Sequence, residues 1–290
     1  MAQLNLMNAA GWAKTVDHVR KLAKVPTITH IVMGSFTVEP RDGNTGGTNF
    51  DVGPDGTAVN SLGLPNGGIP YLERHGSEMV TIAQDAGKAP VISIAGFAPS
   101  EFGILAKLVE QLGATAELNV GCPNVHDKGS HKEIISYNHF DLERTLQVVC
   151  REQTPASHVW IKFSPYSNPL DHEKTVRIAN KFAGHITVVG CNTFPNVSMY
   201  HNSGRPYLDV ADNYAGMSGT ALKWINLSQC RRYVANLSPG IPVLGVGGAS
   251  TAQDVRDYRR IGCAGVQIGA AFFKNENFRV FEEVAEGSAD

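Results

Sequence analysis

The chain has 290 residues, of which 42% are hydrophobic and 18% charged, and its formal net charge is −2. This composition is typical of a folded globular protein, and the charge balance disfavours a nucleic-acid-binding protein, which needs a basic surface. No apolar run approaches the roughly 20 residues that span a bilayer, and no basic N-terminal segment precedes a long apolar one, so we expect a cytoplasmic protein without a membrane segment.

The five cysteines lie far apart in the sequence, and no two form a CxxC pair. They are Cys122, Cys150, Cys191, Cys230 and Cys263. Because zinc and iron–sulfur sites need closely spaced cysteines, we expect no metal site and reduced thiols.

Short apolar runs alternate with longer stretches of helical periodicity along the chain. The runs predict strands at 4–9, 28–33, 90–95, 115–120, 158–163, 186–191, 241–246 and 266–270. The periodic stretches predict helices at about 12–22, 71–85, 99–112, 140–152, 171–182, 221–235, 252–261 and 278–285. We expect loops in the polar, glycine-rich stretch that ends at Gly68 and in the stretch after Asn192.

This alternation predicts the fold class. The strands are continuous apolar runs, which is typical of parallel strands buried on both faces. Eight strand–helix units predict an α/β protein with a (β/α)8 TIM barrel, formed by a single domain over residues 1–290. A doubly wound parallel sheet uses the same alternation and is the alternative.

Polar and glycine residues stand at the ends of seven predicted strands. They are Asn8, Ala9, Ala10, Gly11, Ser35, Thr37, Asn119, Cys122, Asn124, Lys162, Asn192, Thr193, Gly245, Gly247, Gly248, Gly269 and Ala270. Any one of these could be a simple turn former. Together they indicate one site at the mouth of the barrel, where such folds carry their chemistry.

The last two strand ends indicate a phosphate site. Gly247, Gly248, Gly269 and Ala270 would let backbone N–H groups approach a phosphate closely. The segment from Ser218 through Gly219 to Thr220 is expected to open the sixth helix and to cap it or donate to the same phosphate. Since no GxGxxG or Walker A pattern is present, we expect a phosphorylated ligand or cofactor but no Rossmann-type site.

Lys162 interrupts the apolar strand 158–163. A lysine facing the core without a partner is costly, so it either points into the barrel mouth or faces solvent. In the mouth it could hold an anionic group or form a Schiff base with a carbonyl substrate.

Cys122 stands between Gly121 and Pro123 at the end of the fourth strand. A thiol can act as a base when its surroundings assist, and an inert structural cysteine is the alternative.

Five asparagines form a further polar set: Asn60, Asn66, Asn119, Asn124 and Asn192. Carboxamides offer both donors and acceptors, which suits a neutral heterocycle, and they are poor ligands for a divalent metal. His126 and His131, with Lys128 between them, are read as a solvated loop rather than a metal site.

Ten segments, in order along the chain, carry a resemblance to a known family. They are NAAG at 8–11, RDGN at 41–44, NSLGLPN at 60–66, SIAG at 93–96, ELNVGCPN at 117–124, IKFSPY at 161–166, NT at 192–193, SGTALK at 218–223, GVGG at 245–248 and QIG at 267–269. With these the chain resembles the class 1 dihydroorotate dehydrogenases, FMN-dependent barrel enzymes of pyrimidine synthesis.

The resemblance implies that FMN lies across the barrel mouth and that Lys162 stabilises negative charge on its reduced ring. The implied cofactor-binding residues are Ala10, Gly11, Ser35, Asn60, Asn119, Lys162, Asn192, Ser218, Gly219, Gly247, Gly248, Gly269 and Ala270. The implied substrate-binding residues are Asn60, Leu62, Gly63, Leu64, Asn119, Asn124, Asn192 and Thr193.

The resemblance also implies the reaction and the partners. Cys122 would take a proton from carbon five of dihydroorotate while hydride leaves carbon six for the flavin. Relatives work as homodimers or with an iron–sulfur/FAD partner subunit, so the acceptor is either fumarate or that partner.

One position departs from the family. Relatives end the second strand with a lysine that contacts the flavin site and the orotate carboxylate, and this chain has Gly34 there. Loss of a cation from an anion site weakens binding by about 1–3 kcal/mol, and Arg41 or Lys128 are candidates to replace it.

Three alternatives follow. The chain could be an FMN oxidoreductase with a different substrate, or a weakly active FMN-binding subunit. The segment from Asn119 to Pro123 also resembles the dihydrouridine synthases, but the net charge of −2 lacks their basic character.

Overall fold

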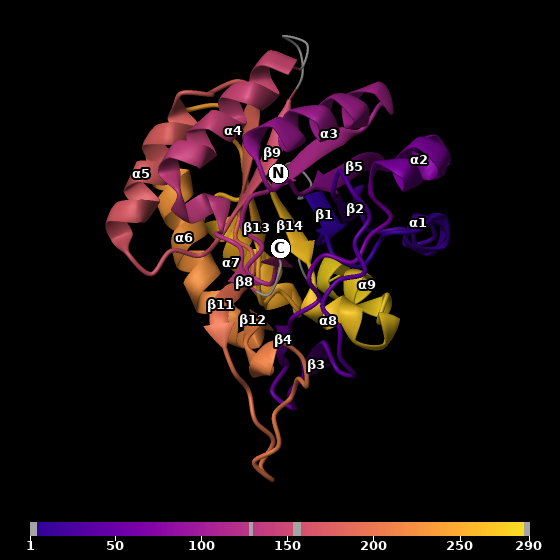
Figure 1. Ribbon diagram of the computed structural model, residues 1–290, viewed down its shortest axis with the longest axis vertical. Coiled ribbons are helices and arrows are strands. Elements are labelled where there is room, and N and C mark those ends of the chain that lie inside the picture. Colours follow the sequence, from indigo (N-terminus) through magenta and orange to yellow (C-terminus); the bar gives the residue numbers. More distant parts are fainter. Residues whose placement is uncertain (1–4, 128–129, 153–157, 287–290) are drawn as a thin grey trace.

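Eight parallel strands form a closed barrel in the computed structural model, which describes residues 5–127, 130–152 and 158–286. Around the barrel the strand order is β1-β14-β13-β10-β9-β6-β5-β2 (Figure 1). The strands are β1 (Asn5–Asn8), β2 (His30–Phe36), β5 (Ala89–Ile94), β6 (Thr115–Asn119), β9 (Val159–Phe163), β10 (Ile186–Gly190), β13 (Val243–Val246) and β14 (Gly265–Ile268). Closure between β1 and β14 confirms the TIM barrel and excludes the doubly wound sheet.

Helices surround the barrel on its outside (Figure 1). They are α1 (Val16–Ala23), α2 (Gly68–Asp85), α3 (Pro99–Gln111), α4 (His139–Glu152), α5 (Pro169–Asn180), α6 (Lys223–Asn236), α7 (Ala252–Arg260), α8 (Ala270–Phe273) and α9 (Arg279–Glu286). The first begins at Val16 rather than near Trp12, because the Thr15 side chain caps it by accepting from the His18 N–H group. Among the helices described, none is long and apolar enough to cross a membrane.

The strands separate two layers of apolar packing. Inside the barrel, Met7, Val32, Trp160 and Leu244 pack together. Between strands and helices lies a second, larger layer, represented by fully buried Ile161. Both faces of each strand are therefore apolar, which explains why the sequence shows continuous runs.

A second sheet was not predicted from the sequence. It is antiparallel, with β11 (Phe194–Val197), β12 (Ala215–Gly219), β4 (Thr57–Asn60) and β3 (Phe50–Val52) in that order. Figure 1 shows these four strands together at one end of the molecule. A short hairpin of β7 (His126–Asp127) and β8 (Ser130–His131) is separate. The expectation of loops was wrong at these strands, while most of the other described residues in the same stretches are turns or irregular structure.

The same sheet corrects the position of one predicted segment. Ser218 and Gly219 end β12 instead of opening a helix, and Thr220 begins a 3-10 turn that leads to α6 at Lys223. Neither caps α6, since the N-cap residue of that helix is Leu222 and makes no side-chain cap hydrogen bond.

Candidate active site

A cavity of about 370 Å³ lies where the carboxyl ends of the barrel strands meet the second sheet. It is within the range of small-molecule sites. It is lined by all the residues that the family resemblance implies for cofactor, substrate and catalysis. They are Ala10, Gly11, Ser35, Asn60, Leu62, Gly63, Leu64, Asn119, Cys122, Asn124, Lys162, Asn192, Thr193, Ser218, Gly219, Gly247, Gly248, Gly269 and Ala270. The structure brings them together, and their roles remain predictions.

The cavity is lined by cations and by no carboxylate. Lys14, Lys162 and Lys274 contribute to its wall, and no Asp, Glu, Arg or His is found among the described residues that line it. Such a lining attracts anionic ligands.

One chain of polar side chains crosses the strand ends. The Asn192 amide donates to Asn119 Oδ1 at 2.8 Å, and the Asn119 amide donates to Ser35 Oγ at 2.9 Å. Ser35 in turn shares a hydrogen bond of 2.9 Å with Ser93. These bonds join the ends of β2, β5, β6 and β10 and fix how the amides face the cavity.

A second chain joins the barrel to the small sheet. Asn124 donates to Asn60 Oδ1 at 2.9 Å, and Asn60 donates to the Gly216 carbonyl at 3.3 Å. Nearby, the buried hydroxyl of Thr193 has no hydrogen-bond partner within the described ranges. Because a buried polar group without a partner is costly, this hydroxyl is a candidate contact for a ligand in the cavity.

Lys162 on β9 faces the interior, so the solvent-facing alternative is wrong: only 5% of its surface is exposed. Its Nζ donates to Gln267 Oε1 at 3.0 Å, and Gln267 Nε2 donates to Glu117 Oε2 at 2.6 Å. Glu117 is fully buried and supplies the compensating negative charge through Gln267. The sequence showed Lys162 but gave no sign of these two partners.

Cys122 is partly buried in the turn that follows β6. A Cβ at the preceding Gly121 would lie 2.7 Å from the Ser164 nitrogen, so glycine is needed for the turn to pass this close to β9. Burial raises the pKa of the Cys122 thiol, and the Asn124 N–H group and the nearby cations, Lys14 foremost, oppose that shift. The thiol is therefore protonated at neutral pH, and the Asn124 N–H group and the cations offset only part of the cost of ionising it.

Glycine conformation shapes the other end of the cavity. Gly219, Gly247 and Gly248 have φ of +74°, +118° and +70°, values that side chains rarely adopt. A Cβ at Gly248 would also lie 2.5 Å from the Lys223 Cβ. At Gly269 a Cβ would make only an ordinary contact with Ala9, so glycine is not required there.

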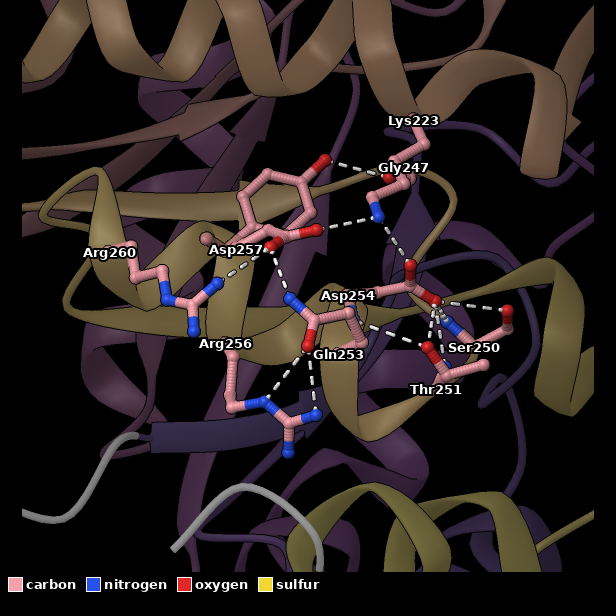
Figure 2. A network of polar contacts seen from close by, with 10 residues as sticks. Lys223, Gly247, Ser250, Thr251, Gln253, Asp254, Arg256, Asp257 and Arg260 are labelled. Carbon is pink, nitrogen blue, oxygen red and sulfur yellow. Dashed lines mark hydrogen bonds and ion pairs between the residues drawn. The ribbon is translucent and has the colours of Figure 1, made fainter. Parts of the chain in front are cut away.

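A network of charged and polar side chains stabilises the turn that carries Gly247 and Gly248 (Figure 2). Lys223 Nζ lies 2.7 Å from Asp254 and 2.7 Å from Asp257. Asp254 Oδ2 also accepts from the N–H groups of Ser250 and Thr251, at 2.9 and 2.8 Å, and so forms the capping box of α7. These contacts stabilise the turn between β13 and α7, whose Gly247 and Gly248 line the cavity.

Some sequence expectations fall elsewhere. Arg41 does not line the cavity: its Nε donates to the Gly63 carbonyl at 3.2 Å and its guanidinium lies over the Phe97 ring. Asn66 also lies outside the cavity, where its Oδ1 accepts from the Thr37 and Gly68 N–H groups.

The loop that the sequence placed around His126 and His131 is only partly described. Lys128 and the side chains of His126 and His131 lie outside the described residues. Across the ranges that are described, no group of three or more potential metal ligands is found.

Comparison with known proteins gives the family. The family model for dihydroorotate dehydrogenase matches residues 3–288. A protein named "Putative dihydroorotate dehydrogenase A (fumarate)" from Streptococcus agalactiae serotype Ia is 28% identical over 290 residues, covering 97% of this chain and 87% of its own. "Dihydroorotate dehydrogenase B (NAD(+)), catalytic subunit" from Pyrococcus furiosus is 33% identical over 259 residues, covering 89% of this chain and 79% of its own. The chain therefore belongs to the dihydroorotate dehydrogenase family.

Proposed function

We propose that this protein is an FMN-dependent oxidoreductase that converts (S)-dihydroorotate to orotate. The observation that supports it most is the composition of the cavity, which combines Cys122, Lys162 and a set of ordered amides with a glycine-lined end and, among the described lining residues, no carboxylate. A neutral heterocycle with an anionic substituent matches the amides and the cations, and a phosphate matches the glycine end.

The residues present fit FMN. A side chain at Gly219, Gly247 or Gly248 would strain the backbone. Glycine leaves the backbone there without a side chain, as close approach of a phosphate requires. Gly269 and Ala270 would complete the phosphate site, with Ala10 and Gly11 beside the ring and Lys162 at its anionic edge. When bound, FMN supplies an acceptor for the hydride that leaves carbon six of the substrate.

Cys122 would act as the base. Its thiolate takes the proton from carbon five, and loss of that proton together with the hydride from carbon six leaves a double bond between the two carbons. Asn60, Asn124 and the free hydroxyl of Thr193 would hold the ring in place.

A second candidate is an FMN oxidoreductase for another substrate, which the glycine at position 34 favours. Gly34 has a φ of +104°, and a Cβ there would overlap the Ser93 carbonyl oxygen, so this backbone has no room for the lysine of the relatives.

The test is anaerobic mixing of purified protein with excess dihydroorotate while the visible flavin band is followed. We expect a yellow protein whose band bleaches. A yellow protein that does not bleach would reject dihydroorotate and leave the second candidate, whereas a colourless protein that binds no added FMN would reject both.

A further inference from the structure

Lys14 is a partly buried lysine of the cavity whose positive charge has no carboxylate partner among the described residues. It lies in the segment between β1 and α1. Its Nζ donates to the Pro65 carbonyl at 2.7 Å, and no ion pair of Lys14 is found in the described part of the chain. An ammonium group has three donors, so two are left for a ligand.

The other lysines of the molecule show how unusual this is. Lys162 is compensated by Glu117 through Gln267. Lys88, which is also buried, lies outside the cavity and donates to the carbonyls of Val25 and Ile28 at 2.6 and 2.9 Å. Lys274 is exposed to solvent. Lys274 also donates to a single carbonyl, that of Val52 at 3.3 Å, so among the described cavity lysines Lys14 differs in being withdrawn from solvent with no carboxylate, direct or bridged, beside it.

Desolvation of this uncompensated cation has a cost. Burial lowers the pKa of Lys14 to about 8, and the neighbouring Cys122 opposes that shift. Withdrawing an ammonium group from water without an anion beside it is unfavourable, and an anionic ligand would remove the penalty.

The backbone places Lys14 at the substrate end. The Gly34 N–H group donates to the Ala13 carbonyl and the Gly11 N–H group donates to the Gly34 carbonyl, both at 2.7 Å. The segment that carries Lys14 is therefore hydrogen-bonded to Gly34, the position at which the family that the sequence resembles has a lysine. Pro65, the partner of Lys14, directly follows the predicted substrate residues Leu62–Leu64.

We propose that Lys14 binds the anionic group of the substrate, and so supplies from the first strand–helix segment the cation that Gly34 lacks on the second strand. This inference rests on the proposed function, because it assigns a residue to the carboxylate of dihydroorotate and orotate. It identifies a specificity determinant: ligands that carry the carboxylate are favoured over the same ring without it.

The test compares orotate with uracil, which has the same ring without the carboxylate, by calorimetric titration of the FMN-loaded protein. We expect the unmodified protein to prefer orotate. Lys14→Met should weaken orotate binding about ten- to hundredfold, the effect of losing one charged hydrogen bond, and change uracil binding less than about threefold. Lys14→Arg should restore most of the orotate affinity and keep it at about pH 9, where the unmodified protein should bind orotate about tenfold more weakly as Lys14 deprotonates.

Lys107→Met is the matched control, since it removes an exposed lysine of α3 that does not line the cavity and should leave the ratio of the two affinities unchanged. If Lys14→Met weakened the binding of orotate and of uracil equally, Lys14 would have only a structural role in its loop, and the inference would be overturned. So would an unmodified protein that does not discriminate between the ligands. If dihydroorotate still bleaches the flavin in either case, the proposed function stands while the role of Lys14 falls.

Discussion

Two opposing effects act on the pKa of the Cys122 thiol, and the proposed chemistry depends on its ionisation. Burial holds its thiol protonated, while Lys14, Arg41 and Lys162 favour the thiolate. Because the base must be ionised and its pKa lies above the ordinary value, the rate of flavin reduction by dihydroorotate should rise with pH through neutrality and beyond. Cys122→Ala should lower that rate about 10²- to 10⁴-fold, which is the usual contribution of a positioned base.

Anaerobic stopped-flow mixing at a series of pH values measures both effects. The FMN content of the variant is the control and should be unchanged. A Cys122→Ala protein that reduces flavin at the normal rate would show the thiol to be a structural one. Cys150→Ala provides a matched cysteine substitution, since Cys150 lies on α4 and does not line the cavity.

The lysines show what the sequence can reveal about single residues. Lys162 is conspicuous because it interrupts a strand whose other residues are apolar, so its inward orientation could be predicted. Lys14 lies in a short segment of mixed polarity, where nothing in the local pattern distinguishes it from a solvated surface lysine. Its position follows from backbone hydrogen bonds to Gly34, and such contacts are invisible in a sequence.

At the scale of elements, the turn between β13 and α7 is stabilised by Asp254. Burial alone would raise the pKa of this carboxyl group, but hydrogen bonds from Lys223, Ser250 and Thr251 outweigh it and hold the pKa below the ordinary value of 3.8. A carboxyl group whose pKa is lowered on folding stabilises the protein above its unfolded pKa, and that contribution is lost as the pH falls through the folded value.

Asp254→Asn should therefore lower the free energy of unfolding at pH 7 by about 1–3 kcal/mol, as expected for a lost charged hydrogen-bond acceptor. The difference from the unmodified protein should shrink as the pH falls from about 4 through the lowered pKa of folded Asp254, below which both proteins carry a neutral group. Urea titrations at several pH values measure this, with Gln253→Ala, an exposed neighbour on α7, as the control. A difference that stays constant down to about pH 2 would contradict the role assigned to the carboxylate.

The small sheet shows why some elements could not be predicted. Barrel strands can be recognised in the sequence as apolar runs because both of their faces are buried. Strands β3 and β4 are short and lie in glycine-rich sequence, and β4 pairs with β12, so that Asn60 lies opposite Gly216. Only the folded barrel brings these segments together, so local pattern predicted loops. The site residues on them, such as Asn60 and Ser218, were identified by residue type and by family motifs rather than from a predicted strand.

For the whole molecule, the barrel and the small sheet should respond differently to the FMN proposed as cofactor. The barrel has its own apolar layers inside and outside the strands, whereas the small sheet buries only a minor cluster around Val59, Leu208 and Val210. Phe50, Val52 and Ser218 of the small sheet line the cavity. A ligand that fills the cavity therefore completes the packing of this sheet more than that of the barrel.

Removal of FMN should then lower amide protection in β3, β4, β11 and β12 by about tenfold or more, while protection in β5, β6 and β9 changes little at early exchange times. Hydrogen exchange followed by mass spectrometry on the protein with and without FMN measures this. The melting temperature should also rise with FMN concentration, since a ligand at a hundred times its Kd stabilises the folded state by about 2.7 kcal/mol. A loss of protection spread evenly over barrel and small sheet would show that the two form one cooperative unit, and that the cofactor stabilises the molecule as a whole.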